Sequence, residues 1–222
     1  MDDPCSYEDL HGCLHDIARV NRLTFAYRPT ISWMQTLVVT QPSSVALRVV
    51  DIGCGHGDML RKIHTWACRS GVPVTLTGID LNPDAIRVAK ESTLQTQPIQ
   101  WIVGDALSDA VPGEIDIIVS SLLAHHLTNP QIIQFLRWMD QRARLGWFIN
   151  DLHRQPVPYH LFRLLSRFTN WHPFVRYDGP VSIRRSFRRE DWQSLCTEAG
   201  LPLETITIQG HRPARLCVGR IK

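Results

Sequence analysis

Apolar and polar positions follow two different periods along this chain. In residues 6–40 the apolar side chains recur at helical spacing, with Leu10, Leu14 and Ile17 on one face and Pro29 interrupting the pattern. From residue 46 onward, short apolar runs alternate with amphipathic stretches. This change of period predicts an N-terminal helical cap followed by a sheet with helices between its strands.

Five apolar runs predict buried strands, at residues 46–53, 73–80, 99–105, 113–121 and 145–151. Helical periodicity lies between most of them, which is typical of a parallel sheet covered on both faces. Two final runs, 202–210 and 215–222, are separated by a short link and predict an antiparallel hairpin at a sheet edge. A helix at 189–199 is expected to end at Gly200, a favourable C-cap.

The segment 152–188 differs from the rest of the chain. It predicts a helix from Tyr159 to about Asn170, followed by an irregular segment rich in aromatic residues and arginine. We therefore expect one domain in four parts: a helical cap (1–45), a cofactor-binding core (46–151), a substrate-lid insertion (152–188), and a closing helix with hairpin (189–222).

Composition narrows the class of partner. The 222 residues are 44% hydrophobic and 20% charged, which is ordinary for a globular protein, and the net charge of +3 is too small to predict a nucleic-acid partner. The six cysteines form no CxxC pair, so reduced thiols are expected. The acidic N-terminus and the absence of a long apolar run predict a cytoplasmic protein without a membrane span.

The first candidate motif runs from Asp51 to Gly57, directly after the first strand. Its glycines have GxGxG spacing, and Asp58 stands where a dinucleotide site would need glycine. Two carboxylates would repel a pyrophosphate but attract a ligand with an ammonium and a sulfonium. A tight turn with incidental glycines is the alternative.

Two further acids end the next two strands. Asp80 can accept hydrogen bonds from both hydroxyls of a ribose, and Asn82 is better placed than Asp80 to cap the following helix. Asp105 can accept from an exocyclic amine, although alone it would indicate only a solvated loop acid. Ligands bind such sheets at the carboxyl ends of adjacent strands, so the three signals predict one crevice.

These motifs resemble those of class I S-adenosylmethionine-dependent methyltransferases: VVDIGCGHGDML, LTGIDLNPDAI, VGDAL and DIIVSSLLAHHL, from about Val49 to Asp151. The resemblance implies a Rossmann-like α/β fold, a seven-stranded mostly parallel sheet of order 3-2-1-4-5-7-6 with an antiparallel last hairpin. It implies S-adenosylmethionine as cofactor and S-adenosylhomocysteine as product. The expected cofactor-binding residues are Asp51, Gly53, Cys54, Gly55, Asp80, Leu81, Asp105, Ala106 and Ser121.

Three histidines follow strand ends that should border this crevice: His126 and His125 after the fourth strand, and His153 after the fifth. Histidine titrates near neutral pH and can take a proton from a hydroxyl nucleophile. They are therefore candidates for a catalytic base, in that order, with packing or helix capping as the alternative role. The fourth strand ends in serines, not in an aspartate, so no metal is expected.

The expected function is SN2 transfer of a methyl group to a small molecule, most readily a hydroxyl and perhaps a phenolic one. The fourth strand lacks the [DN]PP[YF] motif that methylases of base amines usually carry. Two alternatives stay open. The cluster Arg184, Arg185, Arg188 and Arg189 could dock a macromolecule or a carrier-bound substrate, or be a solvated loop. A non-catalytic cofactor-binding regulator is the other alternative, which the intact Gly53–Gly57 loop disfavours.

Overall fold

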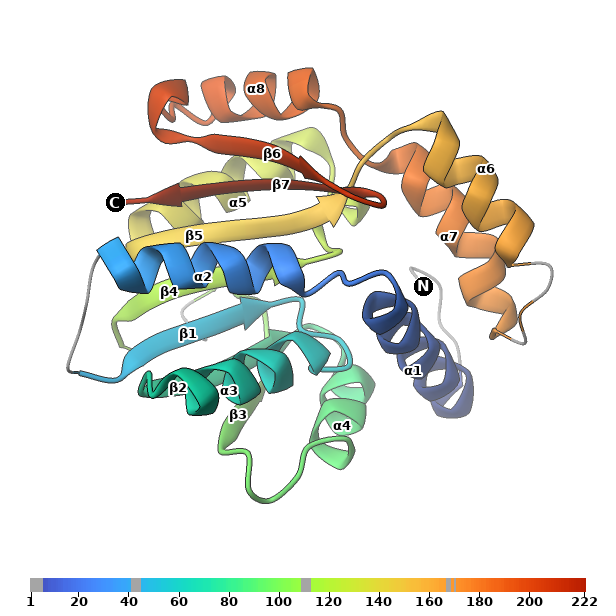
Figure 1. The fold of residues 1–222 in the computed structure, drawn as a ribbon, viewed down its shortest axis with the longest axis horizontal. Helices are drawn as coiled ribbons and strands as arrows, with labels where there is room; N and C mark the ends of the chain where they lie inside the picture. Colours follow the sequence, from blue (N-terminus) through green and yellow to red (C-terminus); the bar gives the residue numbers. More distant parts are fainter. Residues whose placement is uncertain (1–5, 41–44, 109–112, 167–168, 170) are drawn as a thin grey trace.

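The computed structural model describes residues 6–40, 45–108, 113–166, 169 and 171–222. A seven-stranded sheet forms the centre of the domain, with helices on both faces (Figure 1). The strands are β1 (Leu47–Ile52), β2 (Val74–Asp80), β3 (Ile99–Val103), β4 (Ile115–Ser121), β5 (Ala143–Leu152), β6 (Thr207–His211) and β7 (Arg215–Ile221). The α-helices are α1 (Tyr7–Leu23), α2 (Arg28–Thr40), α3 (Asp58–Ser70), α4 (Pro83–Glu91), α5 (Asn129–Arg142), α6 (Pro156–Leu165), α7 (Pro173–Arg185) and α8 (Arg189–Glu198).

The strand order is β3-β2-β1-β4-β5-β7-β6, as predicted. The strands from β1 to β5 pair in parallel, and β7 pairs antiparallel with both β5 and β6. The register places Ser121 of β4 beside Asn150 of β5, and Leu152 of β5 beside Arg215 of β7. Four segments therefore meet at the same end of the sheet: the carboxyl ends of β1, β4 and β5, and the start of β7.

Two apolar cores hold the helices on the sheet. On one face α2 and α3 pack over β1, β4 and β5, where Trp33 stacks on Phe148 with ring centroids 5.2 Å apart. On the other face α5 and α8 cover the sheet around the fully buried Trp147 and Trp192. Because β4 is buried on both faces, four of its seven residues are isoleucine or valine and they do not alternate strictly with polar residues.

Helices α1, α6 and α7 lie beyond the carboxyl ends of the parallel strands (Figure 1). Helix α1 contacts α4 and α7, and α6 contacts α7. These three helices therefore lie over the end of the sheet at which proteins of this fold class bind their ligands. Among the described residues, none of the helices combines the length and the apolar character needed to cross a bilayer.

The prediction for the lid segment was wrong in one respect. Residues 173–185, expected to be irregular, form α7 although Pro180 lies inside it, and α6 begins at Pro156 instead of Tyr159. A Cβ at Gly179 would lie only 2.2 Å from the ring of Phe162, so the glycine lets α6 approach α7 closely. Packing between the two helices thus outweighs poor local propensity. Residues 167, 168 and 170 of the predicted helix lie outside the described residues.

Candidate functional site

The loop after β1 depends on three glycines. Gly53, Gly55 and Gly57 have φ values of 68°, 49° and 74°, which residues with a Cβ rarely adopt. The amides of Gly53 and Cys54 both donate to the carbonyl of Ile79 on β2, at 2.9 and 3.1 Å. The loop therefore bends tightly against the neighbouring strand before α3 begins.

Gly57 also makes room for a side chain of β3. A Cβ at this position would lie 2.2 Å from Cη2 of Trp101. We expect Gly57→Ala to lower the free energy of unfolding by about 2–4 kcal/mol, because backbone strain and overpacking act together. Gly71→Ala is the matched control, since its φ of 65° is similar and a methyl group added there would have no atom within 4 Å. Urea unfolding of both variants checks this, and equal losses would show that Trp101 does not matter.

Three carboxylates surround the loop. Asp51 is only 1% exposed, and its Oδ1 has no hydrogen-bond partner among the described residues. Burial raises the pKa of Asp51, and the nearby charges of Asp58 and Asp80 raise it further. Asp51 Oδ1 thus lacks a donor that would stabilise the charged form of this carboxyl group.

Asp80 receives two backbone hydrogen bonds, from Gly55 N to Oδ2 at 2.9 Å and from Asn82 N to Oδ1 at 3.0 Å. Burial raises the pKa of Asp80, and these two bonds oppose that rise. As predicted, Asn82 is the cap of α4, since its Oδ1 accepts from the amide of Asp84. Each carboxylate oxygen of Asp80 can accept a further hydrogen bond.

This chemistry fits S-adenosylmethionine. The unpartnered buried Asp51 suits an ammonium or sulfonium nearby, and Asp80 suits a pair of hydroxyls. Ser121 lies at the end of the adjacent β4, and its buried Oγ has no hydrogen-bond partner among the described residues. Gly55 holds Asp80 in place through its amide.

The surroundings of the other predicted cofactor residues give less indication of a contact with the cofactor. The Sγ of Cys54 would lie 3.0 Å from a Cβ on Gly78, so this side chain packs against β2. Leu81 and Asp105 are exposed, and Asp105 Oδ1 accepts from the amide of Leu107. Ala106 is buried in the core. For these four residues, as for the other predicted cofactor residues, contacts with the cofactor stay predictions.

The raised pKa of Asp51 has a consequence for stability. An acid with a raised folded pKa stabilises the fold most below its unfolded pKa of about 4, and this contribution is lost as the pH rises through the folded pKa. We expect the unfolding free energy of Asp51→Asn, relative to the parent, to increase between pH 4 and pH 8. Cofactor affinity should fall at the same time, because the charged acceptor is gone.

Denaturant titrations across that pH range, together with calorimetry with S-adenosylhomocysteine, measure the two effects separately. A stability difference that does not change with pH would contradict this role of burial at Asp51.

Histidine and aspartate form a buried pair at the ends of β4 and β5. The ring Nδ1 of His125 lies 2.7 Å from Asp151 Oδ1, and the backbone amide of His125 donates to Oδ2 at 3.1 Å. Burial raises the pKa of Asp151, but the charge and hydrogen bond of His125 and the amide of Leu152 outweigh it, leaving the pKa below its usual value. The Nε2 of His125 makes no hydrogen bond to a described residue. Asp151 can therefore hold the ring with Nε2 available to accept a proton.

The other two candidate histidines lie in different surroundings. His126 is exposed, and its ring lies against His125 with centroids 4.2 Å apart. His153 lies beside Gly210 of β6, with Nε2 3.4 Å from the Gln155 amide, and burial lowers its pKa. The structure thus brings together His125 and Asp151, a pairing that the sequence did not predict.

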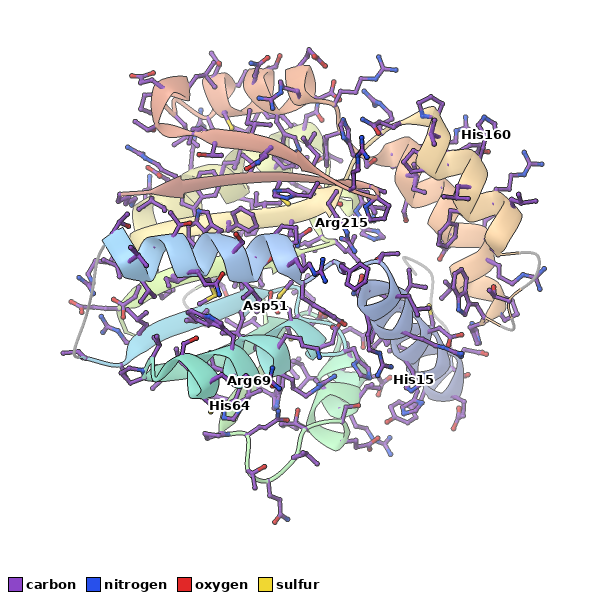
Figure 2. All side chains as sticks on the ribbon, in the orientation of Figure 1. His15, Asp51, His64, Arg69, His160 and Arg215 are labelled. Carbon is purple, nitrogen blue, oxygen red and sulfur yellow. The ribbon has the colours of Figure 1, made fainter. Side chains whose placement is uncertain are left out.

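A polar network joins α1 to the same end of the sheet. The sequence did not predict this network. Arg215, buried at the start of β7, donates from Nη2 to Asn21 Oδ1 at 2.7 Å (Figure 2). Asn21 in turn donates to Asp58 Oδ2 at 3.1 Å, which also accepts from the Tyr27 hydroxyl at 2.7 Å. Helix α1 is thereby joined to α3 and the sheet beside the loop.

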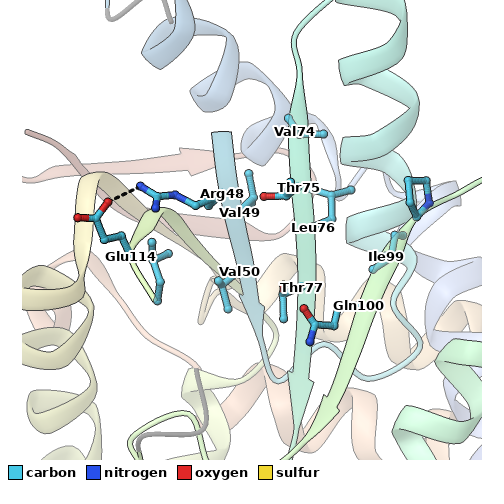
Figure 3. A pocket seen from close by; sticks show the side chains of 12 residues that line it. Arg48, Val49, Val50, Val74, Thr75, Leu76, Thr77, Ile99, Gln100 and Glu114 are labelled. Atoms are coloured by element: carbon cyan, nitrogen blue, oxygen red, sulfur yellow. Dashed lines mark hydrogen bonds and ion pairs between the residues drawn. The ribbon is translucent and has the colours of Figure 1, made fainter. Parts of the chain in front are cut away.

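A groove elsewhere in the fold has a different character. It is lined by residues at the amino ends of β1 to β4, where Arg48 pairs with Glu114 at 2.9 Å (Figure 3). Ligands of such sheets bind at the opposite, carboxyl ends. Among the described residues, no group of three or more His, Cys, Asp or Glu side chains could hold a metal ion.

Fold and site together define a Rossmann-like domain with an acidic, glycine-lined crevice at the carboxyl ends of its strands. The sequence profile of the methyltransferase domain family matches residues 49–146. The ubiquinone biosynthesis O-methyltransferase of Thiobacillus denitrificans is 26% identical over 192 residues, covering 79% of this chain and 73% of the relative. That of Albidiferax ferrireducens is 27% identical over 189 residues, covering 79% and 67%.

Solved structures share the fold. The plantazolicin methyltransferase BpumL, in complex with a substrate analogue and S-adenosylhomocysteine, superposes with a TM-score of 0.68 at 19% identity and covers 94% of this chain and 89% of its own. Magnesium protoporphyrin IX methyltransferase from Synechocystis gives a TM-score of 0.58 at 10% identity, covering 89% and 84%. In sequence and in fold the chain is therefore similar to class I S-adenosylmethionine-dependent methyltransferases.

Proposed function

We propose that this methyltransferase methylates a hydroxyl oxygen of a small molecule, with a phenolic hydroxyl as the favoured acceptor. The buried pair of His125 and Asp151 beside the crevice carries the proposal. A phenol has a pKa of about 10 and is mostly neutral at physiological pH, so a positioned base helps to form the attacking oxyanion. The O-methyltransferase relatives support oxygen as the acceptor atom.

The cofactor, when bound, supplies a methyl group on a positively charged sulfur that a nucleophile can displace directly. Asp51 and Asp80 would hold it, at the ends of β1 and β2. His125 would accept the hydroxyl proton of the acceptor at Nε2, which leaves an oxyanion that can attack this methyl group. Asp151 keeps Nδ1 protonated and stabilises the charged ring. Alignment of the two reactants and exclusion of water provide the remaining acceleration.

The test is transfer of a labelled methyl group from S-adenosylmethionine to a panel of catechols, monophenols, aliphatic alcohols, amines and thiols. The proposal predicts methyl ethers, formed fastest from phenols. Label found only on nitrogen, on carbon, or on added peptide or RNA would overturn it.

A further inference from the structure

The outer helix of the lid is apolar on two sides. Pro158 and Ser166 are buried and Phe162 is half-buried, and this face of α6 meets α7. Val157, Leu161 and Leu164 form a second stripe, which lies more than a quarter-turn away at 100° per residue. These three side chains are 72%, 49% and 53% exposed. A helix that is apolar on both sides is normally covered on both.

The lid, together with the adjoining Arg189, is also the most basic part of the chain. Residues 152–189 contain eight arginines, no lysine, and one acid, Asp178, which gives a net charge of +7 within a chain whose total is +3. Arg163 of α6 and Arg176 and Arg184 of α7 are exposed. Tyr177, at 75% exposed, lies between the arginines of α7. Exposed apolar side chains together with exposed arginines and a tyrosine are typical of helices that lie in a membrane interface.

We propose that α6 and α7 form a docking surface for anionic lipid. The positive charge and the apolar stripe together favour anionic lipid over two other partners, a second copy of the chain and a nucleic acid. A second copy of the chain would bring two +7 segments together, which repels. A nucleic acid would neutralise the arginines but leave the stripe of Val157, Leu161 and Leu164 uncovered. An anionic bilayer matches both the arginines and the apolar stripe, because its headgroups pair with the arginines and its acyl boundary buries the apolar side chains.

The docking surface lies over the same edge of the sheet as the crevice (Figure 1). His160 marks the exposed side of α6, whereas His64 and Arg69 of α3 lie across the molecule (Figure 2). Docking through α6 would therefore turn the carboxyl ends of the strands, with the acceptor side of the crevice, toward the lipid. The proposal does not rest on which acceptor is methylated.

Vesicle co-flotation of the full chain tests this surface. We expect binding to phosphatidylcholine vesicles that contain phosphatidylglycerol, at least tenfold above binding to phosphatidylcholine alone. The double variant Leu161→Asn/Leu164→Asn should lower partitioning about 10- to 100-fold. The triple variant Arg163→Gln/Arg176→Gln/Arg184→Gln should lower it about 100-fold at low salt.

Matched controls use exposed residues away from the lid. Leu94→Asn removes an exposed leucine, and Lys62→Gln/Arg69→Gln/Lys90→Gln removes three exposed cations. Both should keep parental partitioning, and all variants should keep parental circular dichroism and S-adenosylhomocysteine affinity. Absence of vesicle binding, equal binding to neutral vesicles, or equal losses in the controls would overturn the proposal. A dimer that Leu161→Asn/Leu164→Asn dissolves, or tight RNA binding at physiological salt, would assign the surface to those partners instead.

Discussion

Replacement of His125 by alanine is expected to lower kcat by about 10²- to 10⁴-fold while the affinity for S-adenosylhomocysteine changes little. The reason is that the carboxylate of Asp151 orients the ring of His125, whose Nδ1 lies 2.7 Å from Oδ1. Single-turnover methyl transfer to a responsive phenol measures the rate, and calorimetry with S-adenosylhomocysteine measures the affinity.

Three companion variants separate catalysis from packing. Asp151→Asn keeps the shape of the side chain but no longer fixes the ring with Nδ1 protonated, so it should share most of the kcat loss. His126→Ala and His153→Ala should stay near the parent rate, because Asp151 makes its hydrogen bonds to His125 and to the amide of Leu152. Parental rates for His125→Ala would show that the enzyme works through alignment alone or through another base.

The second large effect is expected at Asp80. Asp80→Ala should weaken cofactor binding by about 1.5–3 kcal/mol, because ribose hydroxyls lose a charged acceptor in a partly desolvated place. The amides of Gly55 and Asn82 lose their partner as well, so the loop itself becomes less well held.

Calorimetry with S-adenosylhomocysteine measures this loss, and circular dichroism checks that the sheet persists. Asp84→Ala is the matched control, because this acid is in the first turn of the same helix, α4. Unchanged affinity in a folded Asp80→Ala variant would mean that the ribose is recognised elsewhere.

The sheet could be predicted because the signal for each strand is local. Continuous apolar runs predict strands buried on both faces, and glycines or acids at their ends mark the crevice. The N-terminal helices were likewise expected, although Pro29, which interrupts the periodicity, proves to lie in the first turn of α2. Each of these features can be predicted from the residues of a single segment.

The unpredicted parts depend on contacts between distant segments. The pair His125–Asp151 joins two strand ends 26 residues apart. The sequence did contain a signal for this pair, because β4 and β5 were predicted to be neighbours. Asp151 lies at the end of one apolar run, and His125 follows the other. The link between Arg215 and Asn21 spans 194 residues, and no local pattern of either residue indicates it. Helix α7 was missed because Gly179 and Pro180 disfavour a helix, whereas packing on α6 and α1 stabilises it.

The central claim is that the acidic, glycine-lined crevice binds S-adenosylmethionine and not a dinucleotide. Calorimetric titration of the parent protein with S-adenosylmethionine, S-adenosylhomocysteine and NAD tests it most directly. The acidic group of Asp51, Asp58 and Asp80 predicts binding of the first two ligands and none of NAD, whose pyrophosphate these charges repel. Tight binding of NAD without binding of S-adenosylhomocysteine would contradict it.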